Sequence, residues 1–275
     1  YRQLVFSGIR EILVRKFEIF ITGKMIFLGF LLLSVIGGSR ALPVDERQED
    51  DPELTAGYFE GDIVLDASPR NGVRTGSRWP DAIVYYKFMD GFFDKKQIDF
   101  IKHAMKTIEE DTCVRFKKAG DNQPYFINIT GTPDGCFSHV GYDNKVQAFN
   151  LKPYPVEEGC FRLGSIMHEL MHTLGFHHMQ NTYNRNKYVH IKKKNIKKGH
   201  RHNFKRYGRK HIEDFEAKYD YGSIMHYKKR AFSKNGEKTI VPRKKVKKGE
   251  MGQREALSKI DIYKLNKMYK CKKKH

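Results

Sequence analysis

The stretch that decides the fold runs from residue 168 to residue 178 and reads His-Glu-Leu-Met-His-Thr-Leu-Gly-Phe-His-His. The residues around its first half, 163–174, are apolar nearly all round, which predicts a buried helix. On such a helix His168 and His172 lie four residues apart, so both imidazoles leave the same face, about 6 Å apart in rise. A single zinc ion with Zn–N distances near ~2.0 Å can bridge them.

A glutamate and a third histidine complete the predicted zinc site. Glu169 cannot share the metal with the neighbouring His168, but it can reach a water on the metal from the side. In a continuous helix His178 would lie roughly 15 Å from His168. Gly175 avoids this, because a glycine can end the helix in a left-handed turn and send the chain back under the metal. His177 is the competing third ligand, and we prefer His178 because three residues after the turn give the chain room to come round.

This set of residues indicates a catalytic rather than a structural zinc site. A structural site normally has four protein ligands and no adjacent base, whereas three histidines and a carboxylate leave one position for water. A single His-x-x-x-His pair is usually coincidence, but two histidines, the glutamate, the glycine and the third histidine in register are not.

The charge of the chain is concentrated in its last third. The chain has 275 residues and a formal net charge of +20, and residues 185–275 hold 31 Lys and Arg against 8 Asp and Glu. Residues 185–210 contain 12 basic side chains and no acidic one, and residues 243–248 contain five more. This is either a solvated face or a contact for sulfated glycosaminoglycans or another polyanion. With 39% hydrophobic and 31% charged residues, the chain is neither a multi-span membrane protein nor low-complexity.

The N-terminal region is predicted to be removed in stages. Lys24 and Met25 precede an uncharged run, 26–36, and small residues that allow cleavage after Ser39 or Ala41, which predicts a signal peptide over 25–41 and secretion. The run is too short to span a membrane, although an uncleaved anchor is the alternative. Residues 1–24 fit no part of a signal and are treated as upstream, non-native sequence. Residues 42–70 carry nine acids and two basic groups, which predicts an acidic pro-segment or a solvated linker before a body over 71–275.

Four cysteines and one glycosylation acceptor agree with the secretory route. An even cysteine count predicts two disulfides, and the four residues allow three pairings. Asn128 begins an Asn-Ile-Thr acceptor. The cysteines are Cys113, Cys136, Cys160 and Cys271.

The periodicity of the body predicts an α+β fold. Strands are expected at 82–88, 125–129 and 146–151. Helices are expected after a cap at Asp94, at 163–174 and at 261–269, with long loops between 176 and 260. Strands first and helices later suggest an α+β arrangement.

A second element makes the chain resemble the astacin-type metalloproteases within the metzincins. Residues 219–227 read Tyr-Asp-Tyr-Gly-Ser-Ile-Met-His-Tyr, and the resemblance covers residues 59–271. It implies an astacin-like domain with an N-terminal mixed sheet, a zinc helix and a loop-rich C-terminal half with a terminal helix, in a minimal form without C-terminal modules. It also implies that Met225 forms a hydrophobic floor below the zinc, and that Tyr227 is a displaceable fifth ligand that swings to hydrogen-bond the oxyanion. The disulfides implied are Cys113–Cys271 and Cys136–Cys160.

The resemblance also suggests how the enzyme is kept silent. Phe59-Glu60-Gly61-Asp62 is similar to the family's pro-segment switch, in which Asp62 would occupy the open zinc position of the zymogen. Activation would follow cleavage after Arg70. Residues 146–151 correspond to the family's cleft-edge strand, which would pair with an extended substrate. Met179 departs from the glutamate usual after the third histidine, which puts the anchoring of the new N-terminus at Asn71 in doubt.

The predicted function is therefore peptide-bond hydrolysis by a secreted zinc endopeptidase made as a zymogen. Glu169 would act as general base on a zinc-activated water, and Tyr227 would help to hold the oxyanion. The rival from another class is a protein with a vestigial site that binds polyanions or a membrane surface, and the intact His168, Glu169, His172 and His178 argue against it. Nucleic acid is a poor candidate partner for a secreted chain.

Overall fold

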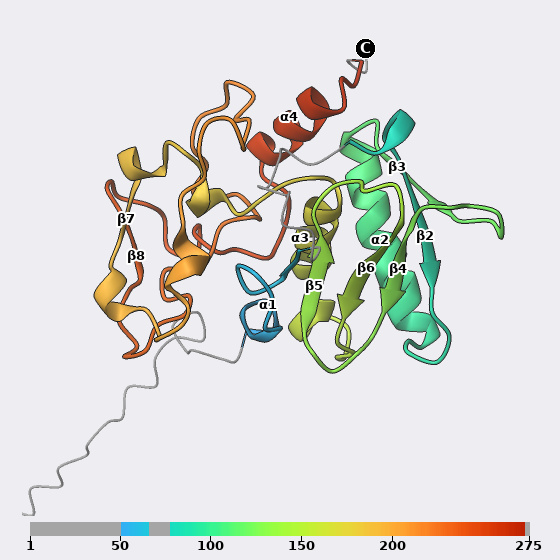
Figure 1. The fold of residues 1–275 in the computed structure, drawn as a ribbon, viewed down its shortest axis with the longest axis horizontal. Helices are drawn as coiled ribbons and strands as arrows, with labels where there is room; N and C mark the ends of the chain where they lie inside the picture. The colour runs from blue at the N-terminus through green and yellow to red at the C-terminus, as the bar shows by residue number, and fades with distance from the viewer. Residues whose placement is uncertain (1–50, 66–77, 273–275) are drawn as a thin grey trace, which may run out of the picture. The chain divides into compact units, whose positions relative to one another are not determined.

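The computed structural model describes residues 51–65 and 78–272 (Figure 1). The predictions for residues 1–24, for the signal peptide and for the cut after Arg70 lie outside these ranges. Within the described ranges no helix combines the length and the apolar composition needed to cross a membrane.

A six-stranded mixed sheet forms the N-terminal half of the described chain. Its order is β1 (Ile63–Val64), β5 (Cys136–His139), β6 (Val146–Leu151), β4 (Phe126–Thr130), β2 (Ile83–Phe88) and β3 (Arg115–Lys118). Only the β5–β6 pair is antiparallel. Buried and half-buried residues alternate along β4, as expected where one face of a sheet covers the core. A separate antiparallel pair, β7 (Val189–Ile191) and β8 (Ile240–Pro242), lies in the loop-rich half.

Two long helices cover one face of the large sheet, α2 (Lys95–Asp111) and α3 (Leu163–Thr173). Asp94 caps α2 by accepting from the Gln97 N–H, and the Gln97 side chain accepts from the Asp94 N–H in return. A short helix, α1 (Pro52–Thr55), precedes β1, and α4 (Lys259–Met268) ends the described chain. Short 3₁₀ turns occupy Pro80–Ala82, Gly159–Phe161, Met179–Asn181, Arg185–Lys187, Lys193–Asn195 and Arg201–Phe204.

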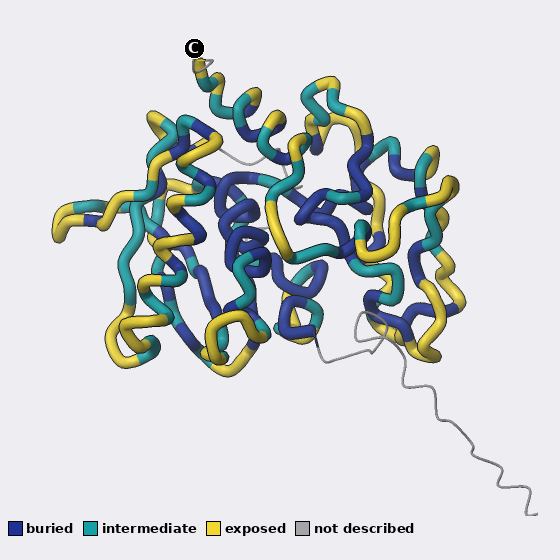
Figure 2. Tube along the Cα trace, turned by 180° about the vertical axis from the view of Figure 1, so that it is seen from behind, coloured by how far each residue is buried: buried dark blue, intermediate teal, exposed yellow. Residues whose placement is uncertain are grey.

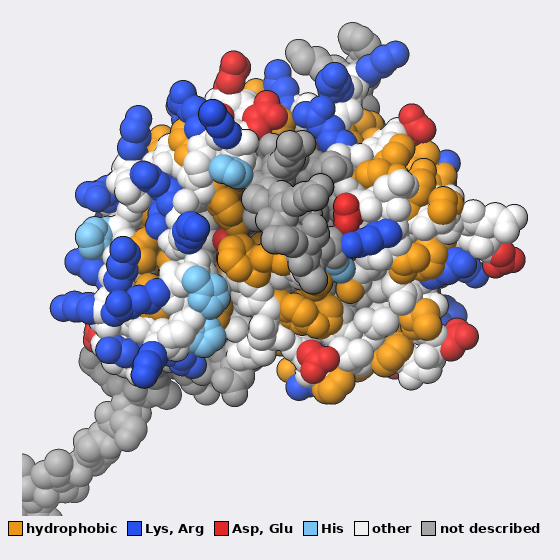
Figure 3. Space-filling model, in the orientation of Figure 1, with side chains coloured by type: hydrophobic (Ala, Val, Ile, Leu, Met, Phe, Trp, Pro, Cys, Tyr) orange, Lys and Arg blue, Asp and Glu red, His pale blue; other side chains and the backbone are white. Residues whose placement is uncertain are grey.

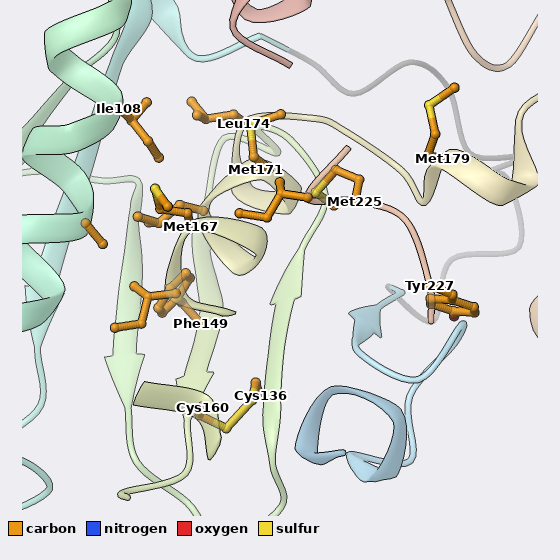
Figure 4. Packing of buried hydrophobic residues seen from close by; sticks show 14 of the residues in the cluster. Ile108, Cys136, Phe149, Cys160, Met167, Met171, Leu174, Met179, Met225 and Tyr227 are labelled. Carbon is orange, nitrogen blue, oxygen red and sulfur yellow. A yellow bond between two sulfur atoms is a disulfide. The ribbon is translucent and has the colours of Figure 1, made fainter. Parts of the chain in front are cut away.

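The core lies between the two helices and the sheet, and α3 is at its centre. Every residue of α3 from Gly164 to Thr173 is buried, and Figure 2 shows the buried tube concentrated in this middle region. Ile108 of α2, Met167 of α3 and Phe149 of β6 meet in one apolar cluster (Figure 4). Burying apolar side chains on all sides fixes the helix from which His168 and His172 project.

The elements expected from the sequence are present, but the five strands β1, β3, β5, β7 and β8 were not predicted. The strands expected at 82–88, 125–129 and 146–151 and the three helices are present within one or two residues. The interpretation of residues 146–151 as a cleft-edge strand is wrong, because β6 is hydrogen-bonded to β4 on one side and to β5 on the other. Both sets of its main-chain groups are occupied, so it cannot pair with a substrate. The strand beyond it, β5, pairs instead with β1 of the N-terminal segment.

Both disulfides implied by the family resemblance are formed. Cys113 and Cys271 join the end of α2 to the residues after α4, with Cα atoms 5.3 Å apart. Cys136 and Cys160 join β5 to the turn before α3, with Cα atoms 5.6 Å apart (Figure 4). The described residues contain no free cysteine.

The cap of α2 gives a stability test. Asp94→Ala should lower the free energy of unfolding by about 0.5–2 kcal/mol, because the Gln97 N–H at the start of α2 loses its acceptor. The measurement is urea denaturation with an unchanged m-value. Asp99→Asn is the matched control on the same helix, since it breaks only an exposed pair with Lys95. Equal losses in the two variants would show that the cap contributes nothing particular.

Candidate metal centre

Three histidines and one aspartate converge at one buried point. The ligand atoms of Asp62, His168, His172 and His178 all lie within 4.8 Å of one another, and all four residues are buried. Asp62 Oδ2 lies 3.2 Å from His168 Nε2 and 3.3 Å from His178 Nε2. Asp62 Oδ1 lies 3.5 Å from His172 Nε2. Two of the histidines come from α3, the third from the turn after it, and the aspartate from the N-terminal segment, residues 51–65.

The other ring nitrogen of each histidine fixes its orientation. His168 Nδ1 lies 2.8 Å from the Ile224 carbonyl oxygen, and His172 Nδ1 lies 2.7 Å from that of Phe176. Because a carbonyl only accepts, each of these Nδ1 atoms carries the proton, and each Nε2 is left with a lone pair that faces the common centre. His178 Nδ1 lies 2.8 Å from Glu60 Oε2, so a carboxylate does the same for the third ring.

The arrangement fits a tetrahedral zinc ion. Ligand atoms at ~2.0–2.1 Å from tetrahedral zinc are about 3.3 Å from one another, which agrees with the distances from Asp62 Oδ2 to the Nε2 atoms of His168 and His178. His172 Nε2 and Asp62 Oδ1 are buried and have no hydrogen-bond partner. Buried polar atoms normally have one, and a zinc ion between them accounts for both. Three imidazoles and one carboxylate therefore hold one zinc per chain.

The turn after α3 works as the sequence predicts. Gly175 has a φ of 104°, in the left-handed region. The Gly175 N–H donates to the His172 carbonyl and the Phe176 N–H to that of Met171, so the helix ends and the chain reverses. His178 then reaches the metal centre, whereas the ring of His177 lies against Tyr207 with 5.1 Å between ring centroids. The choice of His178 over His177 agrees with this geometry.

Glu169 lies beside the metal centre but binds none of its atoms. Its side chain is fully buried, and neither carboxylate oxygen has a hydrogen-bond partner among the described residues. Burial, with the nearby Asp62 and Glu53 carboxylates, raises the pKa of Glu169 well above its ordinary value. A higher pKa makes the carboxylate a stronger base, so Glu169 can accept a proton from a group placed at the centre.

The second motif, residues 219–227, holds the other side of the centre. Its Ile224 carbonyl orients His168, and the Met225 carbonyl accepts from the Met179 N–H at 2.9 Å. Met225 is buried and belongs to the apolar cluster of the core (Figure 4). The ring of Tyr227 stacks obliquely on His178, 4.5 Å between centroids, and its hydroxyl donates to the Glu60 carbonyl rather than to the centre.

Two residues that support this motif were not predicted from the sequence. Asp261, in the first turn of α4, accepts from Ser223 Oγ at 2.6 Å and from the Ile224 N–H at 2.9 Å. Gln180 Oε1 accepts from the Tyr227 N–H at 3.0 Å. The pattern Ser258-x-x-Asp261 does signal a helix start, but it does not reveal that the same carboxylate holds a loop 37 residues away.

The N-terminal segment is bound by more than Asp62. Glu60 contacts His178 through one carboxylate oxygen, and Tyr207 donates to the other at 2.6 Å. Glu53 forms a buried pair with Arg254, whose Nε and Nη2 both reach the carboxylate at 2.5–2.9 Å. The segment also extends the sheet through β1 (Figure 1).

Burial and neighbouring charges shift the pKa values of two histidines at the centre. Burial, together with the Arg254 cation, lowers the pKa of His168 to about 4. Burial opposes protonation of His178 too, but the Asp62 and Glu60 carboxylates raise its pKa to about 9. The histidines must be neutral to bind zinc, so the metal takes the place of a proton at His178.

Two further predictions concern Met179, with the anchoring of Asn71, and the glycosylation of Asn128. Met179 is buried, and its Sδ lies 3.4 Å from Lys264 Nζ, so no carboxylate faces this lysine at that position. Asn71 lies outside the described residues, and its anchoring stays untested. Asn128 lies within β4, with Oδ1 buried and without a partner, and its glycosylation stays a prediction.

Known proteins share this combination of fold and site. The model of the Astacin peptidase family matches residues 72–270. Seminal metalloprotease 1 of Drosophila melanogaster is 46% identical over 228 residues, which make up 80% of this chain and 90% of that protein. Zinc metalloproteinase nas-4 of Caenorhabditis elegans is 34% identical over 82% of this chain and 72% of its own.

A solved structure agrees with the sequence matches. High choriolytic enzyme 1, a hatching enzyme zinc-protease from the medaka Oryzias latipes, aligns with a TM-score of 0.63 and 30% identity over 72% of this chain and 94% of its own. The family match extends over most of the chain and includes all three histidines and the second motif. The chain therefore belongs to the astacin family of zinc metalloproteases.

Proposed function

We propose that this metalloprotease is a secreted endopeptidase, made as a zymogen, in which Glu169 is the general base. The observation that carries the proposal is the position of Glu169, a buried carboxylate without a partner, next to a centre where three Nε2 lone pairs meet Asp62. The reaction is hydrolysis of a peptide bond in an extracellular protein or peptide.

The residues of the chain divide the chemistry among them. When bound, zinc supplies a Lewis acid for the scissile carbonyl and lowers the pKa of the attacking water to about 7. A carboxylate oxygen of Glu169 takes the proton from that water and later passes it to the nitrogen of the leaving amine. Tyr227 Oη, once it no longer donates to the Glu60 carbonyl, donates to the oxyanion that develops on the substrate.

The N-terminal segment keeps the zymogen silent by occupying these groups. Asp62 fills the position that water needs, and the Glu60 carbonyl engages the hydroxyl of Tyr227. β1 pairs with β5 at the edge of the sheet, which is where an extended substrate would pair. Cleavage after Arg70 would separate the segment from the body, residues 71–275.

The proposal of secretion and of the partners is based on the sequence. The signal over 25–41 and the acceptor at Asn128 support an extracellular, glycosylated enzyme, and two formed disulfides agree with an oxidising compartment. The partners we propose are protein or peptide substrates and, for the basic last third, an anionic polymer such as a sulfated glycosaminoglycan.

The third ligand can be tested directly. His178→Ala should lose stoichiometric zinc, because only two histidines and Asp62 would remain, whereas His177→Ala should keep one zinc per chain. The measurement is metal analysis of the purified full chain after dialysis, with circular dichroism to show that both variants fold. Retention of zinc by His178→Ala together with its loss from His177→Ala would reverse the assignment.

The general base is tested by an isosteric change. Glu169→Gln in the activated enzyme should keep zinc and lower kcat by about 10²–10⁴-fold, since the amide cannot take a proton. The assay is cleavage of a quenched fluorescent peptide, and exposed Glu213→Gln is the control. A zinc-loaded Glu169→Gln enzyme with wild-type kcat would contradict the mechanism.

Removing contacts between the N-terminal segment and the body should raise the activity of the uncut chain step by step. Asp62→Ala frees the fourth zinc position, but Glu60, Glu53 and β1 still bind the segment. Adding Glu53→Gln leaves Arg254 buried and unpaired, which costs about 3–5 kcal/mol. We expect activity of the uncut chain on a small peptide to rise from wild type to Asp62→Ala to the double variant. A folded, zinc-loaded double variant as inactive as wild type would exclude silencing by this segment.

A further inference from the structure

We infer that strands β7 and β8 and the turns beside them form a binding surface for a sulfated polysaccharide. The anionic partner proposed above would then be a sulfated polysaccharide, and it would bind at this surface. It rests on charge and surface geometry away from the metal ligands, so binding can be measured without turnover.

The fold brings two basic runs that are distant in sequence onto one surface. His190 of β7 pairs with Val241 of β8, which sets residues 185–210 beside residues 243–248. The Arg243 N–H donates to the Tyr188 carbonyl at 2.7 Å, and the Lys192 N–H donates to that of Thr239 at 2.8 Å. Figure 3 shows Lys and Arg side chains gathered over this part of the molecule, at the left of the view.

The charges on this surface are not neutralised by the protein itself. Lys192, Lys193 and Lys194 are exposed, and none has a carboxylate within 4 Å among the residues that the structure describes. Two lysines elsewhere do have such partners: Lys95 pairs with Asp99, and Lys145 with Asp143. Since residues 185–210 contain no acid at all, the positive potential is available to a ligand.

The backbone under these charges is well anchored. The turn Lys193–Asn195 is fixed by the buried Asn195, whose Nδ2 donates to the Lys238 carbonyl at 2.8 Å. The Lys197 N–H donates to the Phe232 carbonyl at 2.8 Å. A polymer that binds here orders mainly side chains and not loops, which keeps the entropic cost of binding low.

The composition of the surface favours a sulfated polysaccharide over a nucleic acid or a membrane. Among the described residues, the exposed large hydrophobics all lie outside residues 185–248, so this surface offers no exposed Phe, Tyr or Trp for base stacking and no apolar wedge for a bilayer. Of the 17 basic residues in the two runs, 12 are lysines, which act as point charges and lack the planar fork of arginine. Point charges spread along a surface suit a flexible chain of separate sulfate groups.

The surface adjoins the N-terminal segment near the metal centre but does not include the metal ligands. In the turn Arg201–Phe204, the ring of His202 faces Phe59 at 6.3 Å between centroids, and Asn203 Oδ1 accepts from the Glu60 N–H at 3.1 Å. A polymer on the outer lysines would therefore hold the enzyme with its cleft close to proteins on the same matrix.

The test compares two variants with the same change in net charge. The first replaces Lys192, Lys193, Lys194, Lys244 and Lys245 by Gln. The control replaces five lysines exposed on α2 and β3, namely Lys96, Lys102, Lys106, Lys117 and Lys118. The full chain carrying Glu169→Gln is bound to a heparin oligosaccharide over a range of salt concentrations, and the same substitutions in active enzyme are assayed on a small peptide.

We expect the first variant to bind heparin at least tenfold more weakly. Because each contact releases counterions, the slope of log K against log salt concentration should fall in magnitude by about one per lost contact. The control should bind like the parent, and hyaluronan, which has carboxylates but no sulfates, should bind far more weakly than heparin. Equal weakening in both variants, or tighter binding of single-stranded DNA or of phosphatidylserine vesicles than of heparin, would overturn the inference. Peptide cleavage should stay unchanged in both active variants, so a failure to bind heparin leaves the peptidase assignment standing.

Discussion

The orientation of three imidazoles toward one point is the constraint on which the rest of the structure depends. Each ring needs an acceptor on Nδ1 so that its Nε2 can face the metal. The three acceptors come from three separate parts of the chain: the Ile224 carbonyl, the Phe176 carbonyl and the Glu60 carboxylate. The loop-rich half and the end of α3 therefore orient two of the rings, and in the uncut chain the N-terminal segment also contacts the third.

The two halves are connected to this point by short chains of contacts. The buried apolar surface of α3 fixes two ligands against the sheet. On the other side, Asp261 at the start of α4 holds Ser223 and Ile224, and Ile224 holds His168. The disulfide Cys113–Cys271 ties the residues after α4 back to the end of α2. A change in α4 can therefore reach the metal through Asp261, although no residue of α4 is a ligand.

The sequence predicted the parts of the site that are local and missed those that join distant segments. The spacing of His168 and His172, the left-handed Gly175 and the cap at Asp94 depend on neighbours within a few positions, and the structure has all of them. The order of strands does not depend on local pattern, which is why β6 was wrongly expected at an edge. Glu53 and Arg254 are 201 positions apart, and nothing in the periodicity of either stretch indicates that they form one buried pair.

The buried charges of the N-terminal segment give its binding a particular character. Asp62 faces the histidines of the metal centre, and Glu60 contacts His178 and Tyr207. Glu53 pairs with Arg254, so each of the three carboxylates is bound to a group of the body. Burial opposes ionisation of Glu53, but the Arg254 guanidinium outweighs it and lowers the pKa of Glu53 far below its ordinary value. A buried cation left without its partner is costly, so the segment is held even where it does not touch the metal. In the proposed zymogen, a segment that stays attached would return to the metal centre at high effective concentration. The proposed cut after Arg70 would remove this effect, which a shift of equilibrium in the uncut chain would not.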